Sequence, residues 1–175
     1  MALITTVSGA SSDSYATLAE ALSYFTTARG NPEEYEVTGD WTHADTTDPM
    51  REGCMRAATL LIDKLYNFNW TRALDTQRLK APFDGATTDD GIDIANTVIP
   101  EDIKRAQFEI ARALLVDISR LDDQEIGLSS LGVDVINLAF DKYDRPSMLP
   151  PTARLLLKDY GGAKSSGSAR EVRRA

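Results

Sequence analysis

The sequence has little of the chemistry on which most catalytic sites depend. Its 175 residues include one cysteine and one histidine. Cys54 alone excludes an internal disulfide and fits a reducing compartment, and one Cys with one His cannot form a structural zinc site. His43 lies in the polar segment DWTHADTTD, where no nucleophile or orienting acid is marked, so we expect a surface histidine without a catalytic role. With no glycine-rich phosphate loop either, we predict a protein that is not an enzyme and uses no cofactor.

Long apolar runs and a broad excess of positive charge are also missing. No run can cross a bilayer, so we expect no membrane contact, and the N-terminal MALITTVSGA lacks the basic and apolar regions of a signal peptide. The formal net charge of -8 argues against a general duplex-binding protein. Yet residues 163–175 carry four cations and one acid, a net +3, which leaves -11 on residues 1–162. A purification scar, a nucleic-acid arm and a docking peptide would each explain such a tail.

Helical periodicity is what the sequence does contain. Thr17 and Glu20 have the spacing of a capping box that opens a first helix, and Gly30 is placed to end it. Asp48-Pro49 opens a second helix as N-cap and first helical residue, and its small residues Gly53, Ala57 and Ala58 favour close helix packing. The apolar stripes of these two helices are Leu18, Ala21, Leu22, Phe25 and Ala28, and Met50, Cys54, Ala57, Ala58, Leu61, Ile62 and Leu65.

Two further helices follow. Pro100 opens the third, which we expect to be the central core helix, about 20 residues long. Its stripe is Ile103, Ala106, Ile110, Leu114, Ile118 and Leu121. The fourth runs from about Pro151 to Tyr160 with Leu155, Leu156 and Leu157 inside, and Gly161-Gly162 stops it.

Between these two helices the pattern changes to that of strands. EIGLSSLGVDVINLAF has β-branched residues, partial alternation and a glycine at 132, which indicates a hairpin over 124–130 and 133–140. We expect it to pack on the helices or on another subunit. The sequence thus predicts a mainly α, four-helix bundle-like domain over residues 1–162, with a protruding hairpin at about 124–140. Long irregular loops at 31–47 and 67–98 and a flexible basic tail over 163–175 complete it.

Two segments, residues 84–96 and residues 64–80, suggest ligands. DGATTDDGIDIAN invites a calcium interpretation, but Ala86 stands at a ligand position, so Asp-Gly turns explain the segment better. KLYNFNWTRALDTQRLK combines aromatic and basic residues, as a single-strand binding groove does. Its candidate contacts are Phe68, Trp70, Arg72, Arg78 and Lys80. The structural alternative is that Phe68 and Trp70 pack beneath the loop as a satellite core.

The order of these features resembles the head–tail connector, or head-completion adaptor, proteins of tailed bacteriophages. The resemblance covers about residues 12–160. It is carried, in order, by Ser14-Tyr15, residues 24–30, 56–59, 61–63, Trp70 with Arg72, residues 77–79, Pro82, residues 90–92, Ile99-Pro100, Ala106 and Glu109. Ala81 and Phe83 depart from the tryptophan and arginine that are frequent in this class. Some members are labelled DnaT-like single-stranded-DNA-binding proteins.

The resemblance implies a structural virion protein, made in the host cytoplasm and placed in the neck between head and tail. It implies a homo-oligomeric, dodecameric ring beneath the portal protein, in contact with a stopper or tail-tube protein. Genomic DNA would pass through its lumen without sequence recognition, and an acidic wall suits that passage.

The resemblance also implies which segments would contact other proteins. The hairpin would contact a neighbouring subunit or the tail, through Ile126, Leu128, Leu131, Val133 and Val135. The tail would order on an acidic groove of the portal. Its contact residues would be Lys164, Arg170, Val172, Arg173 and Arg174. The alternative is a tail that stays unbound.

Overall fold

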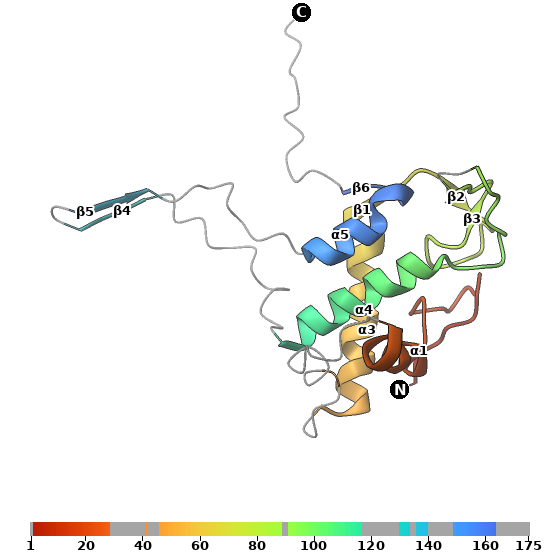
Figure 1. The fold of residues 1–175 in the computed structure, drawn as a ribbon, viewed down its shortest axis with the longest axis horizontal. Coiled ribbons are helices and arrows are strands. Elements are labelled where there is room, and N and C mark those ends of the chain that lie inside the picture. Colours follow the sequence, from red (N-terminus) through yellow and green to blue (C-terminus); the bar gives the residue numbers. More distant parts are fainter. Residues whose placement is uncertain are drawn as a thin grey trace, which may run out of the picture.

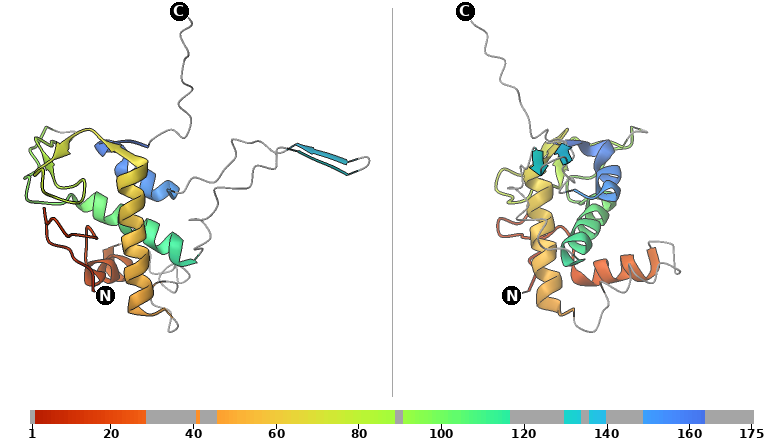
Figure 2. Two further views of the ribbon diagram at one scale, coloured as in Figure 1. Left: turned by 180° about the vertical axis from the view of Figure 1, so that it is seen from behind. Right: turned by 90° about the vertical axis from the view of Figure 1, so that its left-hand side faces the viewer.

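Two long helices form the centre of the molecule. The computed structural model describes residues 2–28, 41, 46–88, 91–116, 130–133, 136–139 and 149–163. Within them, α3 (Asp48–Leu65) packs on α4 (Glu101–Val116), which lies between α3 and α5 (Pro151–Leu157), while α1 (Leu18–Ser23) lies beside α3 (Figures 1 and 2). Helices dominate the described structure, so the mainly α prediction is confirmed. No helix in these ranges is long and apolar enough to span a membrane.

The first helix begins as its capping box predicts. The backbone N–H of Glu20 donates to Thr17 Oγ1 at 3.2 Å, and the N–H of Thr17 donates to Glu20 Oε2 at 2.7 Å. The chain then winds into a π-helix, η1 (Tyr24–Ala28), which directs Phe25 into the core. Leu22 is 47% exposed, so the prediction that it belongs to the buried stripe was wrong. It lies about 100° around the helix from Ala21, which is buried. Gly30 lies outside the described residues.

The second helix begins one residue earlier than predicted. Thr47 is its N-cap, and Asp48 is already helical. The buried face consists of Cys54, Met55, Ala58, Thr59 and Ile62. Met50 is half exposed. Nothing lies within 4 Å of a Cβ added at Gly53, so the close helix packing expected at this glycine is wrong.

The third and fourth helices complete the core. Four of the six stripe residues predicted for α4 are buried, and the other two, Ile118 and Leu121, lie outside the described residues. After α5 the chain forms a 3-10 turn, η3 (Lys158–Tyr160). Leu157 is fully buried, but Leu155 is 70% exposed, so one of the three leucines placed inside was misplaced.

Within the described residues, three small antiparallel sheets accompany the helices. β1 (Tyr66–Phe68) pairs with β6 (Gly161–Ala163), and β2 (Thr71–Arg72) pairs with β3 (Phe83–Asp84). The hairpin is β4 (Ser130–Val133) with β5 (Ile136–Ala139), drawn apart from the helices in Figure 1. Its predicted boundaries were wrong at the turn. Gly132 pairs with Asn137 inside the hairpin, and Val133 belongs to the first strand, opposite Ile136.

Candidate functional site

The aromatic residues of the loop over 67–98 pack on one another. The ring centroids of Phe68 and Phe83 are 4.8 Å apart, and those of Trp70 and Phe83 are 5.9 Å apart. Trp70 also meets Tyr160 edge-on at 6.2 Å. Such tilted contacts bury ring surface against ring surface. Phe68 and Trp70 are partly buried against the core, in agreement with the satellite-core alternative, and only part of each ring faces solvent.

The cations of this segment differ in their surroundings. Lys80 Nζ donates to the carbonyl of Tyr66 at 2.7 Å and lies 5.7 Å from the ring centroid of Phe68, so it is engaged within the fold. Arg72 and Arg78 are exposed. The structure therefore brings Phe68 and Lys80 together and leaves two guanidinium groups on the outside.

A half-buried acid, Asp63, lies near two of these cations. Asp63 accepts a hydrogen bond from the hydroxyl of Tyr15. Burial raises the pKa of the Asp63 carboxyl, although Lys80 and Arg72 act in the opposite direction. Burial, together with the Asp63 charge, also raises the pKa of Tyr15 well above its usual value. Asp63 thus offsets part of the local positive charge.

Gln77 organises the loop from within. Its side chain is buried, at 2% exposure. Its Oε1 accepts from the backbone N–H of Leu74 at 3.0 Å. Its Nε2 is within hydrogen-bond distance of three backbone carbonyls, those of Leu79 at 2.9 Å, Lys80 at 3.2 Å and Pro82 at 3.0 Å. One side chain therefore fixes the path of residues 74–82, and this role was not foreseen from the sequence.

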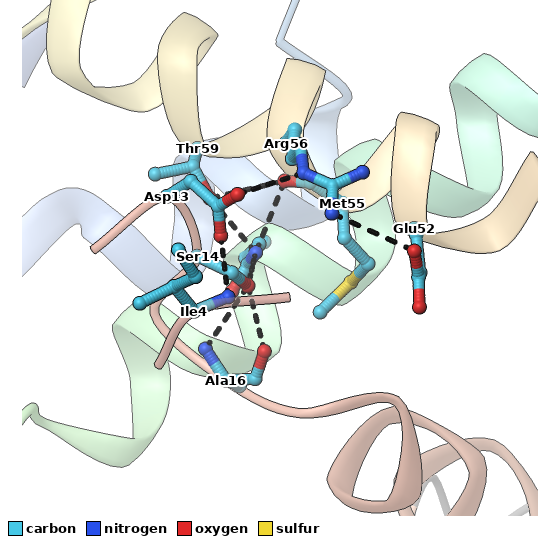
Figure 3. Close-up of polar contacts among 9 residues, drawn as sticks. Ile4, Asp13, Ser14, Ala16, Glu52, Met55, Arg56 and Thr59 are labelled. Atoms are coloured by element: carbon cyan, nitrogen blue, oxygen red, sulfur yellow. Dashed lines mark hydrogen bonds and ion pairs between the residues drawn. The ribbon is translucent and has the colours of Figure 1, made fainter. Parts of the chain in front are cut away.

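The N-terminal segment supports the same loop. Asp13 accepts from the backbone N–H of Ile4 at 2.7 Å and from Arg56 Nε at 2.8 Å, which ties the segment to α3 (Figure 3). Gln107 of α4 donates to Ser14 Oγ at 2.7 Å. The segment held in this way supplies the carbonyl of Gly9, which accepts from the backbone N–H of Arg78 at 3.3 Å.

The described chain ends in a strand fixed to β1. Gly161 has a φ of +156°, and a Cβ there would lie 2.0 Å from the carbonyl oxygen of Asn67. Glycine is therefore required at this crossing. Ala163 pairs with Tyr66, so the first residue assigned to the flexible tail belongs to β6.

Several predicted site residues lie outside the described ranges. They are Lys164, Arg170, Val172, Arg173 and Arg174 of the tail, and Ile126, Leu128 and Val135 of the hairpin region. His43, for which no role was expected, also lies outside these ranges. Leu131 and Val133 lie in β4.

The thiol and the glycines of the two Asp-Gly turns lie within the described residues. Cys54 is buried, and burial raises the pKa of its thiol, in agreement with a structural role. Gly85 and Gly91 have positive φ angles, as Asp-Gly turns require. Among the described residues, no three His, Cys, Asp or Glu side chains are grouped to hold a metal ion.

The geometry defines a small, mainly α protein with a rigid basic loop and an anchored C-terminal strand. The chain belongs, over residues 1–175, to the family described as "Putative DnaT-like ssDNA binding protein". Neither the curated proteins nor the solved structures give a significant match to the chain.

Proposed function

We propose that this protein is a head–tail adaptor of a tailed bacteriophage, which forms a ring beneath the portal and docks on it through its basic tail. The observation that carries the proposal is that the residue just before the basic tail is fixed to the body. β6 holds Ala163 against Tyr66, and the cations of the tail follow Ala163 in the sequence. The resemblance in the order of sequence features supports the same role.

The separation of charge along the chain indicates what kind of surface the tail would bind. The tail carries +3 and the body -11, so the tail fits an acidic groove while the body repels DNA. The twelve residues after Ala163 span at most about 40 Å when fully extended, so the acidic groove must lie within that reach. These features suit a component that links two assemblies around a DNA channel.

Co-sedimentation with the portal ring from the same genome tests this proposal. The full-length chain is compared with a chain that ends at Ala163, which keeps β6 intact. We expect saturable binding by the full-length chain and loss of binding on truncation. Equal binding by both would move the contact to the helices or loops, and no binding by either would contradict the adaptor role.

Single-stranded-DNA binding is the second candidate, because the family description names it. Its residues would be Trp70 and the exposed Arg72 and Arg78. The partial burial of the aromatic rings and the engagement of Lys80 favour the adaptor instead. This candidate requires oligonucleotide binding that weakens with salt and is lost in Trp70→Ala, whereas the adaptor role predicts no such binding at low ionic strength.

A further inference from the structure

The turn over residues 72–78 is rigid before any partner binds. Gln77 is buried and closes the turn through the amide of Leu74, while the backbone N–H of Gln77 returns to the carbonyl of Leu74 at 3.2 Å. The backbone N–H of Ala73 donates to the carbonyl of Pro82 at 3.0 Å, which joins the turn to the β2–β3 pair. A surface held in its binding conformation loses little entropy on association.

The turn carries exposed charge and apolar surface. Arg72 and Arg78 are both exposed, and Asp63 offsets part of the charge of Arg72. Other arginines form close ion pairs: Arg51 with Asp48 at 2.7 Å, and Arg56 with Asp13 at 2.8 Å. Between the two exposed guanidinium groups in sequence, Leu74 is 52% exposed.

We propose that the turn over residues 72–78 is the contact surface for a second copy of this chain. Charge complementarity selects this occupant. Residues 64–80 carry a net +3, while the rest of residues 1–162 carries -14. An arginine-flanked leucine matches the composition of protein interfaces, which are enriched in arginine and apolar at the centre.

A nucleic acid is the less suitable partner. Single-strand binding depends on aromatic faces that are open to bases. Here Trp70 is partly buried against Phe83 and Tyr160, and the outermost side chains of the turn include Leu74 and the acidic Asp75. A contact between this turn and a different surface of the next copy is heterologous, and such contacts form a ring when the rotation between copies closes. The inference thus rests on the proposed ring and names one of its surfaces.

Sedimentation velocity of the full chain over a concentration series tests the contact. The variant Arg72→Glu/Arg78→Glu is compared with Arg154→Glu/Lys158→Glu, which makes the same charge change at exposed cations around the end of α5. A second pair compares Leu74→Ser with Leu60→Ser, a leucine of α3 that is 58% exposed. Thermal unfolding of each variant checks that the fold is retained.

We expect the wild type to self-associate at low ionic strength. Association should weaken by about tenfold or more in the Arg72/Arg78 variant and at high salt, and should persist in the Arg154/Lys158 control. Leu74→Ser should weaken it and Leu60→Ser should not.

Three results would overturn the inference. They are a wild type that stays monomeric at its highest soluble concentration, equal effects in both charge variants, and unchanged association in an Arg72/Arg78 variant that loses oligonucleotide binding. Portal binding is measured separately, on the full-length chain and on the chain that ends at Ala163. Self-association through the turn without portal binding by the full-length chain would refute the adaptor role alone. Portal binding by the full-length chain, with self-association unchanged in the Arg72/Arg78 variant, would refute this inference alone.

Discussion

At Gly161 the backbone crosses β1 so closely that a single added methyl group would meet the carbonyl oxygen of Asn67 at 2.0 Å. At Gly162 the same group would meet nothing within 4 Å. We therefore expect Gly161→Ala to lower the free energy of unfolding by about 2 kcal/mol through backbone strain or loss of the β1–β6 pair. Gly162→Ala should change it by less than about 0.5 kcal/mol.

Urea unfolding of both variants measures this difference. Hydrogen exchange at the amide of Asn69, which donates to the carbonyl of Tyr160 at 3.0 Å, reports whether the end of the pair has opened. Equal stability of the two variants would show that β6 does not hold the tail to the body.

Cys54 should be unreactive in the folded protein. Burial raises the pKa of its thiol, so the reactive thiolate is scarce at neutral pH, and the surrounding helices exclude a reagent. We expect a thiol reagent such as Ellman's reagent to react slowly in native buffer and at once in denaturant. Rapid stoichiometric reaction in native buffer would contradict the structural role.

Single residues also show which contacts could be predicted from the sequence and which could not. The capping box of Thr17 and Glu20 was predictable because both partners lie within one helical turn. The role of Gln77 was not, because its carbonyl acceptors come into reach only after the chain has turned. Trp41 is likewise buried against Phe25, with their ring centroids 5.1 Å apart. No local sequence pattern predicts this contact.

At the scale of the helices, Gly53 gives α3 no packing advantage. It is exposed within the helix, and a Cβ there would point into open space. We expect Gly53→Ala to stabilise the protein by about 1 kcal/mol, through helix propensity alone. Thermal or urea unfolding measures the change, and destabilisation would reveal a contact at this position.

The N-terminus of α1 should weaken in acid. Although burial raises the pKa of Glu20, the hydrogen bonds from Lys104 and Thr17 outweigh it, so the pKa is lowered from 4.5. A lowered acid pKa means that the stabilisation is present above the unfolded value and is lost as pH falls through the folded one. Glu20→Gln should therefore destabilise the protein at pH 7, and less so at about pH 3. Urea unfolding at both pH values measures this, and an equal cost at both would contradict the ionic origin.

Local pattern predicted the helices better than the strands. Proline and cap residues placed the starts of α3 and α4 within one residue. The pairing of β1 with β6 joins segments nearly a hundred residues apart, and the Gly-Gly-Ala of β6 has no strand propensity. The hairpin was foreseen, but its register was not, since Gly132 marks no turn.

The whole molecule combines an acidic body and a basic tail with a C-terminal strand, β6, that is paired with β1. An acidic body and a basic tail suit a protein that docks on an acidic partner while DNA passes by. The composition made the charge separation visible in advance. The anchor of the tail required the fold, because β6 depends on a distant strand.

The most direct test is a density map of the neck of virions produced from the genome that encodes this chain. The account predicts a closed ring of copies directly beneath the portal, in which α3, α4 and α5 are recognisable and β6 faces the portal. A neck built entirely of other proteins, with this chain absent from purified particles, would contradict it.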